Sequence, residues 1–535
     1  MEAFTRLFVA LDQTNRTSEK VDILSDYFAT IDDADGIWTV ALLSGHRIRR
    51  PVSPTHLRLW IAEISQLPQW LVDTCYDRVG DLAETLALLH PTPPQTHLPE
   101  APRSSLAQWI EDRVLPLRNA PADRQREIVV QAWQELSSEA RFLYNKLLTG
   151  AFRVGVQKKT VINALARAHR QDPRAIAQSL TGDWYPNPSL YQKIRYADRN
   201  SSHSLNPFPF CLAHPLGEEE KSKPGEKLGD LRDWLIEWKW DGIRAQLVRR
   251  WDGLALWSRG EEMLNESFPE ILELASRLPP GTVLDGEILA WKEDLPLPFG
   301  DLQKRLGRKK VGKKILQDYP CRFLAYDLLE SDGRPLVDAP TEHRRSLLEQ
   351  LSSSTGLPIS PLLPVESWEA VRQNLEQSRA RRVEGFMLKH RLAPYHAGRV
   401  KGGWWKWKVD PLSVDALLLY AQAGHGRRAG LYTDYTLAVR HEDQWVPFAK
   451  AYSGLDDKEI RRVDAWVRRH TTDRFGPVRA VEPGLVFEIG FEAIRSSSRH
   501  KCGLAVRFPR ILRWREDLGP DDVDTLEDLR SFLPD

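Results

Sequence analysis

The stretch that decides the fold is Glu237-Trp238-Lys239-Trp240-Asp241-Gly242-Ile243-Arg244, which directly follows the apolar run Trp234-Leu235-Ile236. A lysine at the end of an apolar strand, followed by an Asp-Gly turn, is poorly explained as a solubilising surface residue. Because side chains alternate along a strand, Trp238 and Trp240 point away from the face that carries Lys239. Partial removal from water disfavours an ammonium group. The segment therefore predicts a nucleophilic amine backed by indole rings.

A lysine shortly before Asp-Gly is a weak motif alone. Further motifs follow Lys239 in order along the chain, and together they favour its role as a nucleophile. They are Ser258-Arg259-Gly260, Asp285-Gly286-Glu287-Ile288, Phe323-Leu324-Ala325-Tyr326-Asp327, Glu384-Gly385-Phe386-Met387-Leu388-Lys389, Trp405-Lys406-Trp407-Lys408, and Arg507-Phe508-Pro509-Arg510 with Arg513 and Arg515. The ordered series resembles the motifs of covalent nucleotidyltransferases, and in detail those of ATP-dependent DNA ligases of the bacterial three-domain type. The resemblance is specific from about residue 207 to 520 and more diffuse in the N-terminal 200 residues.

Size and composition set the frame. A chain of 535 residues predicts roughly three or four domains. The 75 basic and 74 acidic residues nearly cancel, so binding to a polyanion must come from local clusters. The four cysteines are far apart, which indicates neither a zinc site nor disulfides. We see no signal peptide and no apolar run of the ~18 residues that span a membrane, so we expect a cytoplasmic protein with no membrane partner.

The pattern of apolar residues changes twice along the chain. Residues 1–205 have helical spacing, residues 206–409 mix strands with short helices, and residues 410–535 are mostly strands with one helix near 456–469. We therefore expect a multidomain protein with an all-α N-terminal domain, an α+β core and a C-terminal β-barrel. The resemblance implies that the helical domain binds DNA. The resemblance implies that the core is the adenylation (nucleotidyltransferase) domain, of the ATP-grasp-like ligase class, and that the barrel is an OB-fold.

The resemblance also implies roles for individual residues. Lys239 attacks the α-phosphate of ATP and holds AMP as a phosphoramidate, and Glu237 accepts a hydrogen bond from the adenine amino group. Tyr326 stands where many relatives place a phenylalanine that stacks on adenine. The expected nucleotide-binding residues are Glu237, Arg244, Arg259, Glu287, Tyr326, Arg399, Lys406, Lys408, Arg510 and Arg515.

Acidic residues define a candidate metal site. Asp285 and Glu287 share one face of a strand, which indicates either a solvated edge or ligands for Mg²⁺, because hard cations prefer carboxylate oxygen. The resemblance adds Glu384 as a second carboxylate, so Glu287 and Glu384 are the expected metal ligands. Mg²⁺ is the expected ion, with Mn²⁺ as a substitute, and it would neutralise triphosphate charge.

The segment Trp404–Val409 gives the clearest geometric argument. Alternation places Lys406 and Lys408 on one face and Trp405 and Trp407 on the other. Two neighbouring ammonium groups are not buried unless an anion meets them, because unpaired buried charge is costly. The alternative is an exposed lysine face on an edge strand. In the resemblance, the anion is a polyphosphate.

The barrel end is expected to move during catalysis. In the family, the segment with Arg510 and Arg515 swings over the nucleotide and orients pyrophosphate, which requires a hinge near Asp410.

The helical part offers a candidate DNA contact. Residues 142–156 resemble the helix-Gly-x-x-x-x-Gly-helix element of the ligase DNA-binding domain, where a helix N-terminus grips phosphates without reading bases. The alternative is a plain turn between helices. The expected DNA-binding residues are Arg153, Gly155, Lys158 and Lys159.

The function implied is an ATP-dependent DNA ligase that seals nicks between a 5′-phosphate and a 3′-hydroxyl in double-stranded DNA. The alternatives are an RNA ligase or another polynucleotide nucleotidyltransferase, and a DNA-binding scaffold with a degenerate transferase domain. Residues 421–430 resemble a subgroup of bacterial ligases linked to DNA repair. We expect a monomer, nucleoid-associated when on DNA, with a repair helicase or nuclease as candidate partners.

Overall fold

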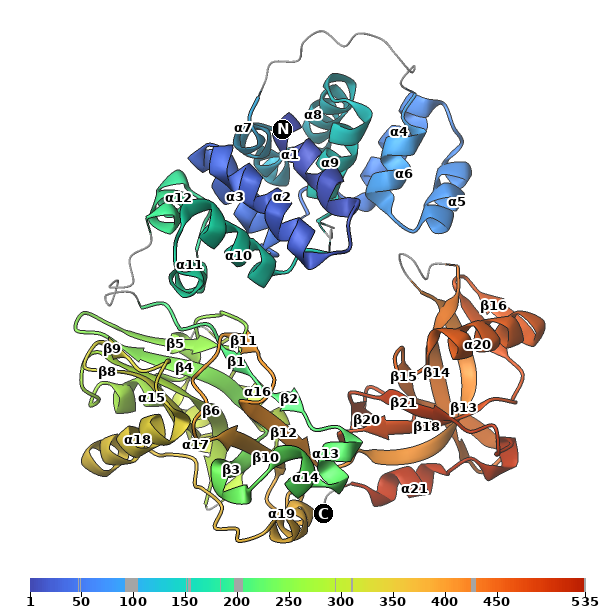
Figure 1. Cartoon of the computed structure of the whole chain (residues 1–535). Coiled ribbons are helices and arrows are strands. Elements are labelled where there is room, and N and C mark those ends of the chain that lie inside the picture. Colours follow the sequence, from blue (N-terminus) through green and yellow to red (C-terminus); the bar gives the residue numbers. More distant parts are fainter. Residues whose placement is uncertain are drawn as a thin grey trace. The chain divides into compact units, whose positions relative to one another are not determined.

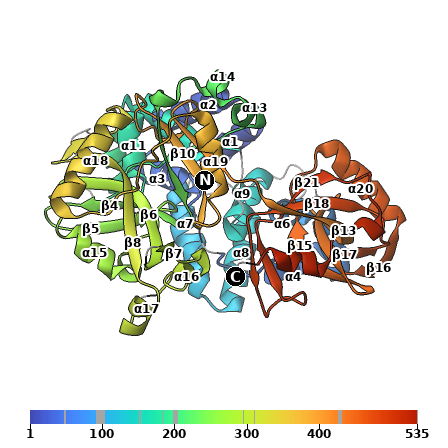
Figure 2. The same cartoon turned by 90° about the horizontal axis from the view of Figure 1, so that it is seen from below.

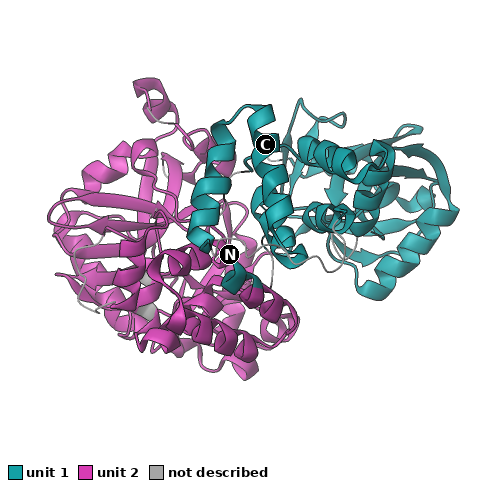
Figure 3. Ribbon diagram, turned by 90° about the horizontal axis from the view of Figure 1, so that it is seen from above, with its two compact units in different colours: residues 1–5, 48–152, 410–535 teal, residues 6–47, 153–409 magenta. Residues whose placement is uncertain are grey.

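The computed structural model describes residues 1–46, 48, 50–91, 104–150, 152, 155–182, 184–196, 205–293, 295–308, 311–424 and 430–533 (Figure 1). The chain divides into two compact units (Figure 3). One comprises residues 1–5, 48–152 and 410–535, and the other comprises residues 6–47 and 153–409. No helix in the described residues is both long and apolar enough to cross a membrane.

The described residues before 205 form helices, as their spacing predicts. Polar side chains cap several of them: Asp32 accepts hydrogen bonds from the amides of Ala34 and Asp35 at the start of α3. The helices are α1 (Glu2–Asp12), α2 (Thr17–Thr30), α3 (Asp33–Leu43), α4 (Pro54–Ser65), α5 (Gln69–Val79), α6 (Leu82–Leu89), α7 (Leu106–Arg113), η1 (Leu115–Asn119), α8 (Ala122–Glu135), α9 (Ser138–Thr149), α10 (Lys158–His169), α11 (Pro173–Ser179) and α12 (Pro188–Arg195).

A six-stranded antiparallel sheet follows, in the order β5-β4-β6-β8-β9 with β7 beside β6. One face is apolar, with Leu247, Leu284, Ile288 and Phe323 in its core. The helices α15 and α18 contact β8 (Figure 2). The elements are β4 (Ile243–Arg249), β5 (Leu254–Ser258), β6 (Thr282–Lys292), β7 (Leu295–Pro296), β8 (Cys321–Ser331), β9 (Arg334–Pro335), α15 (Pro269–Ala275) and α18 (Thr341–Thr355).

A second sheet of four strands has the order β2-β12-β10-β3. Its apolar face packs Trp238, Phe386, Trp405 and Trp407 around Val371 of α19. The strands are β2 (His214–Pro215), β3 (Trp234–Trp240), β10 (Val383–His390) and β12 (Trp404–Lys408), and α19 spans Trp368–Glu376. Shorter elements complete this region: β1 (Cys211–Leu212), β11 (Gly398–Arg399), α13 (Glu218–Ser222), α14 (Pro224–Leu228), η2 (Leu231–Asp233), η3 (Asn265–Ser267), α16 (Phe299–Gln303) and α17 (Lys313–Asp318).

The described residues from 410 onward are mostly strands. The long strand β13 pairs with both β14 and β18, β14 pairs with β15, and β18 pairs with β21. Just after β15, the carbonyl of Ser453 accepts a hydrogen bond of 3.0 Å from the amide of Ile511 in β21. The elements are β13 (Leu412–Ala423), β14 (Tyr432–His441), β15 (Gln444–Ala451), α20 (Asp457–Arg469), β16 (Thr471–Phe475), β17 (Val478–Val481), β18 (Val486–Phe491), β19 (Ala493–Ser496), β20 (Leu504–Arg507), β21 (Arg510–Trp514), η5 (Pro520–Asp522) and α21 (Leu526–Ser531).

Candidate active site

The register of the four-stranded sheet places the predicted lysines on one face. Met387 of β10 lies opposite both Glu237 and Lys406, and Gly385 lies opposite Lys408. Residues directly opposite one another in a sheet point to the same side, and this side is opposite to the apolar core of the sheet. Glu237, Lys239, Lys406 and Lys408 therefore share the face that alternation predicts for them.

Glu384 reaches this same face because of an irregularity in β10. Regular alternation would send its side chain to the core side with Phe386, but the register shifts between Val383 and Phe386. At Gly385 the backbone has φ +126, and a Cβ there would lie 2.1 Å from the carbonyl oxygen of Trp407. Only glycine fits this bulge. The carboxylate of Glu384 consequently forms ion pairs with Lys239 and, at 3.4 Å, with the Lys408 Nζ.

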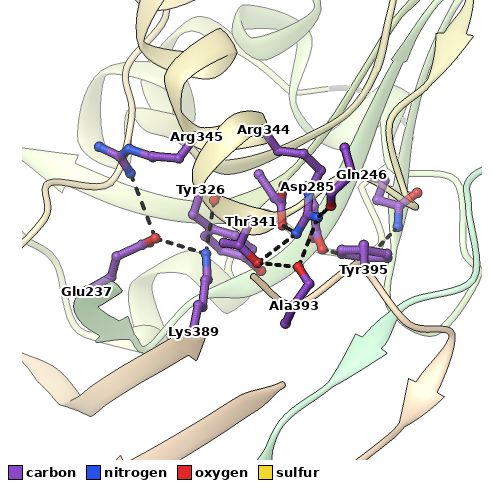
Figure 4. Close-up of polar contacts among 12 residues, drawn as sticks. Glu237, Gln246, Asp285, Tyr326, Thr341, Arg344, Arg345, Lys389, Ala393 and Tyr395 are labelled. Atoms are coloured by element: carbon purple, nitrogen blue, oxygen red, sulfur yellow. Dashed lines mark hydrogen bonds and ion pairs between the residues drawn. The ribbon is translucent and has the colours of Figure 1, made fainter. Parts of the chain in front are cut away.

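Glu237 is buried and paired with a lysine that we did not include among the predicted site residues. Its Oε1 lies 2.9 Å from the Nζ of Lys389 and 3.8 Å from an arginine nitrogen of Arg345 (Figure 4). Lys389 also donates to the carbonyl oxygen of Tyr326 at 2.9 Å. In the sequence, the only sign of a role for this lysine is that it ends the motif Glu384–Lys389. The pair joins β3 to β10 beneath the predicted adenine contact.

Arg244 is held by a buried carboxylate. Its guanidinium donates to both oxygens of Asp285, at 3.1 and 2.6 Å. Figure 4 shows Tyr395 beside the same carboxylate, to which its hydroxyl donates at 2.6 Å. Burial alone would lower the pKa of Arg244, but the Asp285 charge, with Tyr326 and Tyr395, raises that pKa well above its usual value. Asp285 is thus a counterion for an arginine. Its side chain is fully buried.

Glu287 lies in β6 of the six-stranded sheet, and the pKa of its carboxyl group is strongly raised. Burial raises the pKa of its carboxyl group to about 8, against the opposing influence of Lys239 and Arg244. The two sheets meet near this site, because Lys389 of β10 donates a hydrogen bond to the carbonyl oxygen of Tyr326 in β8 at 2.9 Å. Among the described residues, no group of three His, Cys, Asp or Glu side chains is preformed to hold a metal ion.

We expect the substitution Glu287→Gln to stabilise the protein, and increasingly so as the pH rises from about 4.5 to about 8. In that window the unfolded chain loses the Glu287 proton, whereas the folded chain keeps it, so wild-type stability falls with rising pH. The glutamine has no proton to lose. At pH 8 the difference should be on the order of 2 kcal/mol, after solvent screening. Urea unfolding at pH 5 and pH 8 measures it, and an equal difference at both pH values would contradict the expectation.

Lys406 and Lys408 are half-buried beside aromatic residues. Trp405 and Trp407 pack into the core on the opposite side of β12, as alternation predicts. Burial lowers the pKa of Lys406, and the charges of Lys408, Lys239 and the nearby Arg399 lower it further. Several cations therefore lie on this face of the sheet, and Glu384 is the carboxylate that pairs with two of them, Lys239 and Lys408. An added anion would relieve this repulsion.

The remaining predicted nucleotide contacts differ in placement. Tyr326 is half-buried in β8, near the ring of Trp404. Arg259 is exposed after β5, and its backbone amide donates to the carbonyl oxygen of Arg244 at 3.0 Å. Arg399 is exposed in β11. The side chain of Tyr326 thus lies in the site. Arg259 contacts the site residue Arg244 only through its backbone.

The two predicted arginines of the C-terminal β region have different surroundings. Arg510 begins β21 and forms no ion pair with any described residue. Arg515 is held within the C-terminal β region, with nitrogens 2.6 Å from Asp415 and 2.8 Å from Asp517. These two carboxylates raise the pKa of Arg515. Arg510 is therefore the arginine available to an outside anion.

The predicted DNA contacts lie around the start of α10. Gly155 has a left-handed backbone, φ +61, and its carbonyl oxygen accepts a hydrogen bond from Lys20. The Lys158 Nζ lies 2.7 Å from an oxygen of Glu261, and Lys159 is exposed. Arg153 lies outside the described residues, as do residues 425–429 of the repair-linked stretch.

Comparisons with known proteins find DNA ligases as relatives of this chain. Three family models match in succession: DNA ligase N terminus over residues 1–166, ATP dependent DNA ligase domain over residues 221–408, and ATP dependent DNA ligase C terminal region over residues 428–518. A probable DNA ligase of Koribacter versatilis is 31% identical, over 98% of this chain and 95% of that protein. A DNA ligase of Methanothermobacter thermautotrophicus is 27% identical, over 98% and 96%.

A solved structure shares the fold. The structure named Pmar-Lig_PreS3 matches with a TM-score of 0.62 over 96% of this chain and 99% of its own, at 15% identity. The helical N-terminal region, the two-sheet nucleotidyltransferase core and the C-terminal β domain therefore follow the architecture that the sequence predicted. By its motifs, its site and the full-length match to a relative, the chain belongs to the ATP-dependent DNA ligases, enzymes that use ATP to seal nicks in DNA.

Proposed function

We propose that sealing proceeds through an AMP covalently held on Lys239 and then on the 5′ end of the nick. The observation that supports this is the shared face of Glu237, Lys239, Lys406 and Lys408, which faces Glu287 on the other sheet. A nucleophilic amine, several cations for a triphosphate and carboxylates for a divalent ion are thereby gathered in one place.

Three displacements at phosphorus account for the reaction. First, the Lys239 Nζ attacks the α-phosphorus of ATP, a P–N bond forms, the bond to pyrophosphate breaks and the nitrogen gives up a proton. Next, an oxygen of the 5′-phosphate attacks the same phosphorus, the P–N bond breaks and the amine recovers a proton. Finally, the 3′-hydroxyl attacks the 5′-phosphorus, loses its proton and displaces AMP. The ion pair with Glu384 holds Lys239 in position before the first step.

The cations of β12 would bind the triphosphate. Burial and the neighbouring charges of Lys408, Lys239 and Arg399 lower the pKa of Lys406 in the free enzyme, so a polyphosphate bound beside it would relieve a repulsion already present. Tyr326 would stack on adenine. The two hydrogen bonds to Asp285 fix the orientation of the Arg244 guanidinium, so Arg244 would contact the nucleotide without moving.

Glu287 and Glu384 fit a divalent cation by the chemistry of their oxygen donors. Mg²⁺ is commonly held by one or two carboxylates together with substrate phosphates, so a preformed group of three protein ligands is not required. When bound, Mg²⁺ neutralises charge on the triphosphate and on the leaving pyrophosphate. Mn²⁺ has the same ligand preference. Glu287 would bind the ion as a carboxylate. Glu384 would bind the same ion as well as its two lysine partners, Lys239 and Lys408.

We further propose three domains, residues 1–205, 206–409 and 410–535, the last of them an OB-fold. Support for the OB-fold comes from the strand pairing: β13, β14, β15, β21 and β18 follow one another and return to β13, if the hydrogen bond between Ser453 and Ile511 is counted as the join. Five strands arranged around a core, with α20 between the third and fourth in sequence, suit this small barrel.

The proposed substrate is nicked double-stranded DNA, bound through its backbone irrespective of sequence. Gly155, Lys158 and Lys159 stand at the start of α10, where a helix N-terminus favours phosphate. Arg153 completes the set proposed from the sequence. We propose a monomer that works in DNA repair with a helicase or nuclease, in the cytoplasm and on the nucleoid. The sequence similarity of residues 421–430 to repair-linked ligases supports the pathway.

Incubation with ATP labelled at the α- or the γ-phosphate tests the proposed intermediate. Label should remain on the denatured protein only from α-labelled ATP, and it should require Mg²⁺ or Mn²⁺. Peptide mapping should place the label on Lys239. Label on another residue, or retention of the γ-label, would overturn the assignment.

We expect Arg510→Ala and Arg515→Ala to fail in different ways. Arg510 has no ion-pair partner among the described residues, so its loss should spare the fold but slow self-adenylation about 10²-fold, the scale of one charge contact in a transition state. Arg515→Ala removes the partner of Asp415 and Asp517, so it should also lower the melting temperature. Single-turnover adenylation and thermal unfolding of both variants measure this. Normal adenylation with slow joining of a pre-adenylylated nick would make the barrel a DNA clamp alone.

A further inference from the structure

Lys389 is a buried lysine that the proposed chemistry does not use. Its side chain is 2% exposed, although burying an ammonium is costly unless it is well paired. The ammonium donates to the Oε1 of Glu237 and to the carbonyl oxygen of Tyr326, both at 2.9 Å (Figure 4). It also lies 4.5 Å from the ring centroid of Tyr326 and 4.6 Å from that of Trp404. One cation thus links the two residues that the proposed function assigns to adenine.

The contacts of Glu237 leave one of its oxygens open. Oε1 is shared by Lys389 and, at 3.8 Å, by Arg345, which itself donates to the carbonyl oxygen of Ser360 at 2.8 Å. Oε2 has no hydrogen-bond partner among the residues that the structure describes. Two cations on the same oxygen fix the rotation of the carboxylate. Oε2 is therefore an acceptor with a set direction.

We propose that Lys389 is a positioning residue for base selection, and that it acts through Glu237 to make the enzyme prefer a 6-aminopurine nucleotide to a 6-oxopurine nucleotide. The inference rests on the proposed function, in which Glu237 accepts from the adenine amino group. An ionised carboxylate can only accept hydrogen bonds. The 6-amino group of adenine donates, whereas the 6-oxo group of hypoxanthine or guanine is a second acceptor. Two acceptors that face each other lose the hydrogen bond and repel.

Removal of the Lys389 charge should weaken this preference. In Lys389→Met the side chain keeps its approximate length, but Glu237 loses its nearest cation and retains only the more distant Arg345. A buried carboxylate without its partner takes up a proton more readily, and a protonated carboxyl group can donate to a 6-oxo group. We expect the ratio of self-adenylation rates with ATP and with inosine triphosphate to fall about 10- to 100-fold, the worth of one hydrogen bond to a charged group.

The experiment compares single-turnover self-adenylation by α-labelled ATP and α-labelled inosine triphosphate, at saturating Mg²⁺, in the full-length chain. Lys389→Arg keeps the cation and should keep most of the wild-type ratio. Glu237→Gln, whose amide both accepts and donates, should lose the ratio to a similar extent as Lys389→Met. Because the lysine acts through the glutamate, the double variant should discriminate no worse than either single variant.

Several outcomes would overturn the proposal. A wild-type enzyme that does not discriminate between the two nucleotides contradicts it directly. So does a folded Lys389→Met variant whose rates fall equally with both nucleotides, because the pair is then only structural. If Lys389→Met does not fold, an unchanged ratio in Glu237→Gln overturns it in the same way. Absence of label on wild-type Lys239 would instead refute the proposed function, and the two failures are thereby distinguished.

Discussion

The substitution Lys239→Ala is expected to abolish self-adenylation, with a loss of at least about 10⁴-fold, because no other group replaces the attacking amine. Sealing of an ordinary nick should be lost with it. The fold should survive, since the Lys239 side chain is partly exposed and Glu384 keeps Lys408 at 3.4 Å. Gel assays of adenylation and of nick sealing measure both losses.

The same variant should still seal a nick that already carries AMP on its 5′-phosphate. The last displacement uses the 3′-hydroxyl and does not need the Lys239 nitrogen as a nucleophile. Lys227→Ala serves as a matched control, because Lys227 pairs with Glu219 on the surface and lies outside the site. Covalent AMP on Lys239→Ala at near wild-type level would refute the assignment of the nucleophile.

Much of this site could be predicted from the sequence because it depends on strand periodicity. Alternation along Trp404–Lys408 placed the lysines and tryptophans on the correct faces. The same rule placed Glu237 on the same face of its strand as Lys239. Such predictions need only that a segment is a strand. The apolar run before Glu237 and the Trp-rich segment made that assignment secure.

Alternation could not predict the position of Glu384. The rule sends its side chain to the core, and only the bulge at Gly385 turns it toward Lys239. The family resemblance supplied this residue, whereas its geometry depends on the close approach of the Trp407 backbone. A local pattern does not contain that approach.

Pairings between distant segments were also beyond the sequence. Lys389 and Glu237 are 152 residues apart, and nothing in either strand indicates that the lysine is buried and points at the glutamate. The role of Asp285 was likewise left open between a solvated edge and a metal ligand. Its actual partner, Arg244, comes from the neighbouring strand. Charge pairing across a sheet depends on register, which composition does not reveal.

We expect Asp285→Ala to be strongly destabilising, by roughly 3–5 kcal/mol, because it leaves the Arg244 guanidinium buried without its counterion. An arginine cannot shed its charge to escape this cost. The Tyr395 hydroxyl loses its acceptor as well. The melting temperature of the nucleotidyltransferase core should fall by about 10 °C. Calorimetry or near-UV circular dichroism during heating measures it.

Glu287→Gln is the matched control, because Glu287 lies two residues further along the same strand and also carries a carboxyl group. The two substitutions should change stability in opposite directions. Asp285 forms an ion pair with Arg244 and stabilises the fold, whereas burial raises the pKa of Glu287 to about 8 and makes its charge a cost to the fold. An Asp285→Ala variant that kept its melting temperature but needed more Mg²⁺ for adenylation would make Asp285 a metal ligand. A fall in stability without that change in Mg²⁺ requirement identifies it as the counterion that holds Arg244 in place.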